Sequence, residues 1–361
     1  MDKHTILVTS SIKPTPGGGV GNVEYQLIES LKKLGYKVDE FFPKLPSMFL
    51  TDLLFGIFLQ DPYTNYVVNS HTNISWWDKD AIRVFHGCTA KGEEVANSEG
   101  DRVLKKGLYF TINKWMEKSC VNNNYCIAVS QYVADALVKY YGADPKKVAV
   151  VHNGVDTDKF YPCKTCGIEL REENHIPKNA FVVSWVGGFE FNKGIYYLKE
   201  VIDKCAENKN IYFIVRNSTR VEIPEEHKWL MHTPHVIYSS HGGEMAEFYN
   251  TSDLFLHTAT YDPMPLSVLE AMSCTKPVIC ANSGGHAEVV QTGLNGYVVD
   301  DYKDTKTMAE TIIWLSKNKK VVKELGRFAR KRILKSFTAA KMVDEYIKVF
   351  KKFTKMREQD V

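Results

Sequence analysis

What the chain lacks excludes several classes of protein. The apolar stretch 48–59 is too short to span a bilayer and is interrupted by Asp52, so it does not predict a transmembrane helix. The N-terminus carries no signal-peptide pattern, from which we expect a cytoplasmic protein. A net charge of only +3 gives no reason to expect a nucleic-acid partner. Low-complexity tracts are absent too, and 361 residues, 44% of them apolar, suit a globular protein of two domains.

Cysteine patterns that build metal sites are scarce as well. The eight cysteines fit an intracellular protein with reduced thiols, several of them in apolar runs. Cys163 and Cys166 form a single CxxC, with no second pair and no nearby histidine pair, which argues against zinc. We therefore expect no metal site.

Short apolar runs alternate with helical patterns along most of the chain. In the first half the expected strands are Thr5–Thr9, Tyr36–Phe42, Tyr66–Asn69, Ile82–Phe85, Tyr125–Val129 and Val148–Val151. In the second half they are Phe181–Val186, Ile211–Val215, Val236–Tyr238, Leu254–His257, Val278–Cys280 and Tyr297–Val299. Ser130 is the expected N-cap of a helix over Gln131–Tyr140. The pattern predicts an α/β protein with two Rossmann-like, doubly wound parallel-sheet domains that face a cleft.

The alternation is interrupted once, between residues 155 and 178. This segment contains Pro162, Gly167 and Pro177 and is interpreted as an interdomain linker. It leads from an N-terminal domain, 1–160, to a C-terminal domain, 178–338. Parallel sheets bind ligands at the carboxyl ends of their strands, so we expect a ligand cleft between the two domains.

Two acids, Asp262 and Glu270, stand eight residues apart in the second half. Pro263 and Pro265 restrict the loop that leads from Asp262 to a helix expected to begin near Ser267. The N–H groups at the start of such a helix favour an anion, and Glu270 is expected in its first turn. This arrangement favours a phosphate-bearing ligand whose hydroxyls a carboxylate can bind.

Several segments in a fixed order resemble one family, the retaining glycosyltransferases of the GT-B fold in group 4. The resemblance covers nearly the whole chain. The matching segments are Gly17–Gly19, Ala128–Ser130, Asn153–Asp156 with Phe160 and Pro162, Val186 and Gly187 with Lys193 and Gly194, Asp262–Met272, Pro277 and Val278, Gly284 and Gly285, Glu288–Val290, and Asn295 with Gly296. In this family the last helix returns to the first domain, so the resemblance implies that 339–361 joins 1–160.

The resemblance implies a phosphate-binding role for four residues. Gly17, Gly18 and Gly19 would let the backbone approach the donor diphosphate, because no side chain obstructs the loop. Lys193 would neutralise the diphosphate. The plainer interpretations are a tight turn for the glycines and a surface side chain for the lysine.

The resemblance also assigns the ribose and the sugar. Glu270 would bind the ribose hydroxyls, whereas the plainer interpretation is a charge near a helix N-terminus. The backbone from Met264 through Pro265 and Leu266 to Ser267 would line the sugar and the phosphate.

The resemblance also assigns one histidine to the sugar site. His86 follows the strand Ile82–Phe85, where the family places a histidine beside the transferred sugar; a core histidine is the alternative. With Asp262, His86 would shape the sugar site. His71 and His241 are candidates for the cleft wall only.

The chain departs from the family pattern at two positions. Asp262 stands where the family usually has glutamate, so its carboxylate is one methylene shorter. Gly188 stands where the family usually has an arginine that meets the diphosphate, and losing one charge-assisted hydrogen bond costs about 1–3 kcal/mol. Arg216, at the end of a neighbouring expected strand, is a candidate to supply the missing charge.

The implied reaction is transfer of a sugar from a UDP- or GDP-linked donor to an acceptor hydroxyl, with the anomeric configuration kept and without a cofactor. The leaving phosphate itself would help to deprotonate the acceptor. The acceptor would be a glycan or a lipid-linked molecule. The stretch 48–59 fits either a buried helix or an interfacial patch in peripheral contact with a membrane.

Three alternatives to this reaction are carried forward. They are a catalytically impaired nucleotide-sugar-binding subunit, a nucleotide-sugar epimerase of the GT-B fold, and a sugar phosphorylase. Asp156 and Asp158 form a DxD, which binds metal in a different glycosyltransferase fold. Its place at the expected domain boundary favours a structural role instead.

Overall fold

The computed structural model describes residues 5–9, 20–41, 66–70, 81–98, 107–217, 222–239 and 244–360. The chain divides into two compact units, Met1–Gly154 with Ala339–Val361 and Val155–Thr338. The last helix, α12 (Ala339–Asp360), therefore belongs to the first unit.

The segment 155–178, expected to be an interdomain linker, is grouped with the second unit. Phe160 and Ile176 are buried, and Arg330 donates to the Phe160 carbonyl at 2.7 Å. A short helix, α6 (Ile168–Glu173), packs against α8 (Met245–Thr251). The segment is thus a packed connection, because Phe160 and Ile176 are buried, although Tyr161 and Ile168 are exposed.

The first unit contains a six-stranded parallel sheet. Its strands are β1 (Thr5–Thr9), β2 (Lys37–Phe41), β3 (Tyr66–Ser70), β4 (Ala81–Phe85), β5 (Tyr125–Ala128) and β6 (Val148–Val150). They lie in the order β2-β1-β3-β4-β5-β6, and every pairing is parallel. All six coincide with the expected strands to within one residue. The order reverses between β1 and β3, which is the switch point of this sheet.

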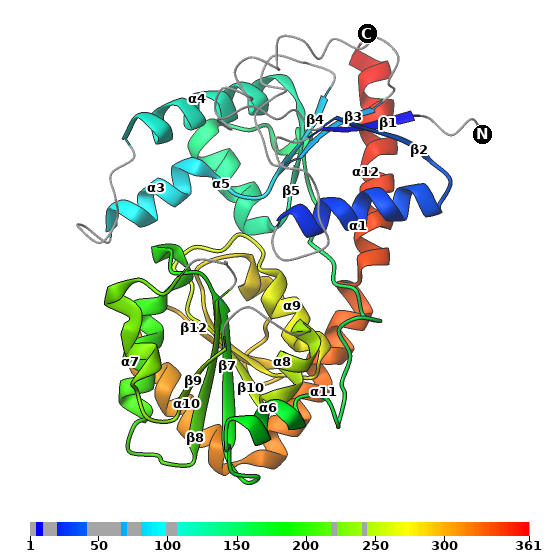
Figure 1. The fold of residues 1–361 in the computed structure, drawn as a ribbon. Coiled ribbons are helices and arrows are strands. Elements are labelled where there is room, and N and C mark those ends of the chain that lie inside the picture. The colour runs from blue at the N-terminus through cyan, green and yellow to red at the C-terminus, as the bar shows by residue number, and fades with distance from the viewer. Residues whose placement is uncertain are drawn as a thin grey trace. The chain divides into compact units, whose positions relative to one another are not determined.

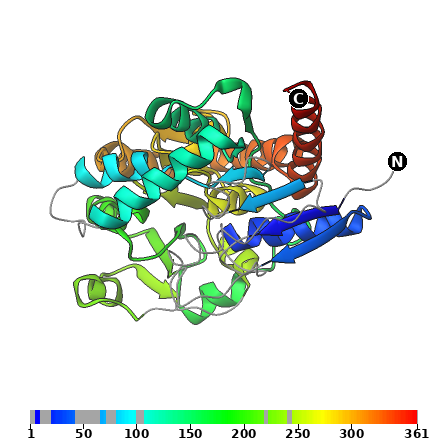
Figure 2. The same cartoon turned by 90° about the horizontal axis from the view of Figure 1, so that it is seen from above.

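Helices cover both faces of the first sheet (Figure 1). They are α1 (Val20–Lys33), α3 (Thr89–Ser98), α4 (Gly107–Asn123), α5 (Gln131–Tyr141) and α12. Helices α1 and α12 pack together on one face, while α3, α4 and α5 pack on the other. Figure 2 shows the same pairing from above, with α12 in red beside the blue N-terminal elements.

Ser130 caps α5 as expected. Its Oγ accepts the Val133 N–H at 3.2 Å, and the helix ends at Gly142 in the left-handed conformation, with a φ of 74°. A side-chain acceptor at the first turn and a glycine after the last residue satisfy backbone groups that a helix leaves unpaired.

The second unit contains another six-stranded parallel sheet. Its strands are β7 (Phe181–Gly187), β8 (Ile211–Asn217), β9 (Val236–Ser239), β10 (Leu254–His257), β11 (Val278–Ala281) and β12 (Gly296–Val299). They lie in the order β12-β11-β10-β7-β8-β9 and coincide with the expected strands to within two residues. The order reverses between β7 and β10, so this pair forms the switch point.

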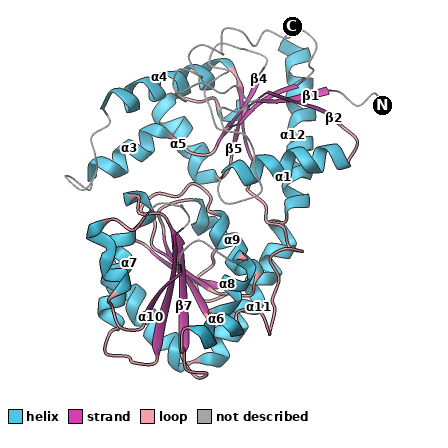
Figure 3. Ribbon diagram, viewed as in Figure 1, coloured by secondary structure: helices cyan, strands magenta, loops and turns pink. Residues whose placement is uncertain are grey.

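The helices of the second unit enclose its strands on both faces, as the secondary-structure colouring of Figure 3 shows. They are α6, α7 (Ile195–Cys205), α8, α9 (Leu266–Ser273), α10 (Thr305–Lys317) and α11 (Lys319–Ser336). Helices α7 and α10 pack together on one face, and α8, α9 and α11 lie on the other. The core includes Phe181, Trp185, Ile279 and Leu325. Both sheets confirm the predicted fold class.

One expectation about cysteine is wrong. Cys163 and Cys166 are joined in a disulfide, with their Cα atoms 5.3 Å apart, because the turn before α6 brings the two residues of the CxxC together. The other six cysteines are free and buried. Among the residues that the structure describes, no helix is both long enough and apolar enough to cross a bilayer.

Candidate functional site

The switch point between β7 and β10 is built by two loops that are bonded to each other. The loop after β7 contains a 3-10 turn, Phe191–Lys193, and the loop after β10 leads to α9. The Thr260 N–H donates to the Asn192 carbonyl at 3.0 Å, and the Thr258 hydroxyl donates to the Gly194 carbonyl at 2.9 Å. Gly194 has a φ of 73°, and a Cβ there would lie 1.8 Å from the Thr258 carbonyl oxygen. Only glycine allows this close approach.

This bonding places Lys193 against Asp262. The Lys193 Nζ lies 2.8 Å from Asp262 Oδ2. Asp262 raises the pKa of Lys193 against the lowering effect of burial, and Glu190 adds to the rise. Burial would raise the pKa of Asp262, but the Lys193 ammonium together with His257 and His286 outweighs burial, so that this pKa is lowered. Both groups are therefore charged at neutral pH.

Two histidines that the sequence did not assign to the site lie beside Asp262. His257, the last residue of β10, has its Nε2 3.7 Å from Asp262 Oδ2, and its ring meets that of His286 edge to face at 4.8 Å. Burial lowers the pKa of His257 to about 3, with His286 acting in the same direction. Burial also lowers the pKa of His286, whose Nε2 lies 2.6 Å from the Ala281 carbonyl oxygen. Both imidazoles are neutral near pH 7.

The glycine loop after β11 fixes the backbone of the acidic loop. The Gly285 N–H donates to the carbonyls of Asp262 and Pro263, at 3.3 and 3.0 Å. A Cβ at Gly284 would lie 1.9 Å from the Asp262 carbonyl oxygen, so a larger residue would separate the two loops. His286 is the residue after Gly285, whose N–H donates to the Asp262 carbonyl. This explains how a histidine far along the chain reaches Asp262. The position of His257 at the carboxyl end of a strand was the signal for it in the sequence.

Helix α9 begins at Leu266, one residue earlier than expected, and Glu270 is its fifth residue, which lies beyond the first turn where it was expected. The N-cap, Pro265, has no side-chain acceptor for the first helical N–H groups, which leaves the start of α9 suited to an anion. Met264 and Leu266 are buried, and Ser267 is half-buried.

Glu270 has a neutral partner in place of a cation. The Tyr249 hydroxyl of α8 donates to Glu270 Oε2 at 2.8 Å. Burial raises the pKa of Glu270 to about 7, while the Tyr249 hydrogen bond and the more distant Lys159 lower it. No motif pointed to Tyr249, because only packing of α8 beside α9 brings it to Glu270.

The structure describes both the departure at Gly188 and its candidate compensation, Arg216. A Cβ at Gly188 would lie 1.9 Å from a carboxylate oxygen of Glu190, so this acid occupies the space into which a side chain at 188 would extend. Arg216 is buried near the end of β8, with its guanidinium 5.5 Å from the centre of the Phe248 ring. Burial lowers the pKa of Arg216.

The other predicted residues belong to the first unit or to parts of the chain that the structure does not describe. Gly17, Gly18, Gly19, His71, His241 and the stretch 48–59 lie outside the described residues. His86 follows β4 and belongs to the first unit. Asp156 supports the structural interpretation of the DxD, because its Oδ1 accepts the N–H groups of Asp158 and Lys159 at 2.9 and 3.1 Å.

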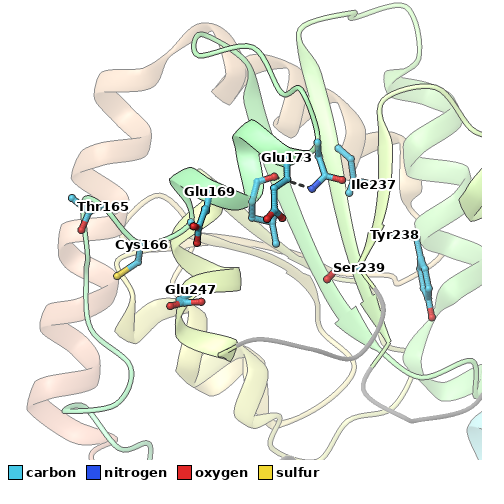
Figure 4. Close-up of a pocket in the computed structure, with 11 residues that line it drawn as sticks. Thr165, Cys166, Glu169, Glu173, Ile237, Tyr238, Ser239 and Glu247 are labelled. Carbon is cyan, nitrogen blue, oxygen red and sulfur yellow. Dashed lines mark hydrogen bonds between the residues drawn. The ribbon is translucent and has the colours of Figure 1, made fainter.

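A cavity of about 610 Å³ lies elsewhere in the second unit, beside β9 and α6. Glu169, Glu173 and Glu247 lie around it, with Tyr238 and Ser239 of β9 on another side (Figure 4). None of the predicted donor-binding residues lines it. Within the described parts of the chain, no three His, Cys, Asp or Glu side chains are grouped to hold a metal ion.

Comparison with family models identifies both halves of the chain. The model "Glycosyl transferases group 1" matches residues 168–332, and "Glycosyltransferase Family 4" matches residues 57–159. The two matches together span well over half of the chain. The alpha-maltose-1-phosphate synthase of Mycolicibacterium smegmatis is 25% identical over 262 residues, which is 67% of each chain.

Solved structures share the fold. Sucrose-phosphate synthase from Thermosynechococcus elongatus has a TM-score of 0.79 and 17% identity, over 97% of this chain and 99% of that one. HepE from Anabaena, solved in complex with UDP-glucose, has a TM-score of 0.73 and 16% identity, over 97% of this chain and 100% of that one. At such identities the likeness concerns the fold.

Proposed function

Because the chain belongs to the group-4 glycosyltransferases of the GT-B fold, we propose that it transfers a sugar from a nucleotide diphosphate donor to an acceptor hydroxyl with retention of configuration. The proposed donor is linked to UDP or GDP, and the acceptor is a glycan or a lipid-linked molecule. The UDP-glucose complex of HepE supports a donor of this class. We propose no cofactor.

One observation carries this proposal: a lysine, a carboxylate and an uncapped helix start meet at the switch point of the second sheet. Lys193 comes from the loop after β7, while Asp262 and the start of α9 come from the loop after β10. A cation and helix N–H groups at one place favour a diphosphate. Glu270, on the same helix, provides the acceptor atoms that ribose hydroxyls require.

In the proposed reaction, the bond between the anomeric carbon and the diphosphate oxygen breaks. The acceptor oxygen bonds to the same face of that carbon, and its proton passes to the leaving phosphate. Negative charge grows on the diphosphate, which Lys193 would stabilise after exchanging Asp262 for phosphate oxygens. Asp262 and His86 would contact the sugar.

The remaining roles follow the family pattern. The backbone of Gly17, Gly18 and Gly19 would approach the diphosphate, and Arg216 would supply the charge that is missing at Gly188. If Arg216→Ala left the donor affinity unchanged, this role of Arg216 would be contradicted. Peripheral membrane contact through 48–59 stays a prediction.

The test is a thermal-shift screen against UDP, GDP, ADP and their common sugars, followed by NMR of the product. We expect one nucleotide class to stabilise the protein, by about 2.7 kcal/mol at a concentration of 100 times Kd. The anomeric proton of the product should show the configuration of the donor. A protein that none of these nucleotides stabilises would contradict the proposal.

A specific observation favours a second candidate, a nucleotide-sugar-binding subunit without catalysis. Lys193 forms an ion pair with Asp262, and Glu190 also interacts with it electrostatically. The charge of Lys193 is therefore partly balanced before any diphosphate binds. Such a protein would bind a donor and transfer nothing over a broad acceptor panel. An epimerase would convert the donor sugar and leave the acceptor unchanged, and a phosphorylase would need inorganic phosphate.

A further inference from the structure

We propose that Tyr249 is a positioning residue for the donor: its hydroxyl orients the Glu270 carboxylate so that the free oxygen accepts the ribose hydroxyls. The inference rests on the proposed function, in which Glu270 binds the ribose. It adds a residue outside the Asp262–Met272 segment, on a different helix. Tyr249 would act through Glu270 and would not itself contact the donor.

The geometry of the pair supports an orienting role. The Tyr249 hydroxyl donates to Glu270 Oε2 at 2.8 Å. A carboxylate has two oxygens and about four lone-pair positions, so this bond occupies one side of the group and leaves Oε1 available as an acceptor. A 2′- and a 3′-hydroxyl on one ribose would suit the remaining positions.

Tyr249 is held in place by aromatic neighbours. Its ring meets those of Phe160, Phe248 and Phe255 edge to face, at centroid distances of 6.1, 5.9 and 5.6 Å. The side chain is completely buried. Edge-to-face contacts on several sides restrict the ring, and the hydroxyl therefore has one direction in which to point.

The next residue fixes the end of α8. Asn250 Oδ1 accepts the Cys163 N–H at 3.1 Å, and Asn250 Nδ2 donates to the Tyr161 carbonyl at 3.0 Å. The helix is thereby fastened to the segment that carries the disulfide. Tyr249 is thus held by several contacts besides its hydrogen bond to Glu270.

The surroundings of Glu270 explain why it needs this donor. The titratable and charged groups near it are Tyr249, Cys274 and Lys159. Burial raises the pKa of the Cys274 thiol to about 12, so this group stays neutral. The Tyr249 pKa is raised well above 10 by burial, so the phenol remains a donor throughout the neutral range. Without Tyr249, the Glu270 carboxylate would be protonated at a higher pH.

The experiment compares UDP with 2′,3′-dideoxy-UDP, or GDP with its dideoxy form, depending on the nucleotide that binds the wild-type protein. Calorimetry on the full chain would be run for the wild type and for Tyr249→Phe. We expect the variant to bind the ribose nucleotide about tenfold more weakly, as for loss of one hydrogen bond to a charged group. Its affinity for the dideoxy nucleotide should equal that of the wild type. The pH below which ribose-nucleotide binding is lost should also rise.

Two further variants separate positioning from packing. Tyr346→Phe removes the hydroxyl of another buried tyrosine, in α12 of the first unit, and should leave both affinities unchanged. In a Glu270→Gln background, Tyr249→Phe should cost nothing more, because the group through which it acts is gone. An equal loss for the ribose and dideoxy nucleotides in Tyr249→Phe would overturn the proposal.

Failure of the proposed function has a different signature. If Glu270→Gln binds the ribose nucleotide as tightly as the wild type, Glu270 is not the ribose ligand and the inference falls with it. Should Tyr249→Phe fail to fold, the double variant Tyr249→Phe/Glu270→Gln is compared with Glu270→Gln, since it leaves no carboxylate buried without a donor. Equal affinities then support the proposal, and a further loss contradicts it.

Discussion

Asp262 and Glu270 belong to one short stretch of chain and lie in opposite electrostatic environments. Asp262 pairs with an ammonium at 2.8 Å, and its pKa is lowered. Glu270 accepts from a neutral phenol, and burial raises its pKa to about 7. Both carboxylates are buried, at 7% and 8% exposure. The opposite pKa shifts of the two carboxylates therefore come from their different partners and not from different solvent access.

This comparison indicates how one loop and helix can support two chemical tasks. Two acids whose environments separate their pKa values are able to play different roles at one pH. Asp262 is ionised at neutral pH and balances the charge of Lys193. A carboxylate that titrates near neutral pH responds to what binds beside it. The predictions below test this contrast.

The largest expected effect is the pH dependence of folding stability due to Glu270. The unfolded chain releases this proton near pH 4.5 and the folded protein near pH 7. The folded state holds more protons within this window, so the free energy of unfolding should fall as the pH rises through it, by on the order of 3 kcal/mol. Urea unfolding of the wild type and Glu270→Gln between pH 5 and 8 measures it, and the variant should lack this slope.

Asp262→Asn is the matched control for that experiment. The pKa of Asp262 is lowered from 3.8, so its stabilising contribution is present above pH 3.8 and is lost only as the pH falls through the lowered value. The slope between pH 5 and 8 should therefore survive in this variant. A slope that disappears in Asp262→Asn and persists in Glu270→Gln would reverse the assignment.

The second prediction concerns a substitution that removes the ion pair between Lys193 and Asp262. Lys193→Met should lower the free energy of unfolding by about 2–3 kcal/mol, because it leaves a buried carboxylate without its cation. The loss is smaller than for a fully buried pair, since the Lys193 side chain is 33% exposed. Adding Asp262→Asn should recover most of the stability. If the double variant is no more stable than Lys193→Met, loss of the ion pair is not the cause of the destabilisation.

The third prediction concerns a substitution that lengthens the side chain of Asp262 by one methylene. Asp262→Glu should destabilise the protein by about 1–2 kcal/mol, because it inserts a methylene into a buried site beside His257 and Lys193. Urea unfolding at pH 7.5 measures the change, and Asp301→Glu on the surface is the control. An unchanged midpoint would show that the loop can accommodate the longer acid at no cost.

The smallest expected effect concerns Lys159, which lowers the pKa of Glu270 from a distance. Lys159→Gln should move the midpoint of the Glu270 pH dependence upward by roughly 0.2–0.5 pH units at low salt. The shift should shrink in 0.5 M salt, because Lys159 is exposed and its charge is screened. A downward shift would show that Lys159 does not act on Glu270 through its charge.

Local sequence patterns predicted the strands, the Ser130 cap and the start of α9 because each depends on neighbouring residues. The alternation of apolar runs was sufficient to place all twelve strands described here. The partners of the two acids were not predicted. Tyr249 reaches Glu270 only when α8 packs beside α9, and His286 reaches Asp262 only through the Gly284 turn.

Two other features also depend on tertiary packing. The segment 155–178 has the composition of a linker, and its residues Phe160 and Ile176 are nevertheless buried. The Cys163–Cys166 spacing fitted reduced thiols as well as a disulfide, and only the turn before α6 brings the two residues together. Composition indicates the local structure that a segment favours, whereas its tertiary contacts depend on the rest of the fold.

The return of α12 to the first unit has a consequence for biosynthesis. Phe353 stacks on Tyr125 at 4.5 Å, and Met342, Tyr346 and Phe350 are buried in the same unit. Residues 155–338 are translated before this helix and form the second unit without interruption. On the ribosome, the second unit can therefore complete its core while the first still waits for its closing helix. Of the two units, the one whose strands are translated first is therefore completed second.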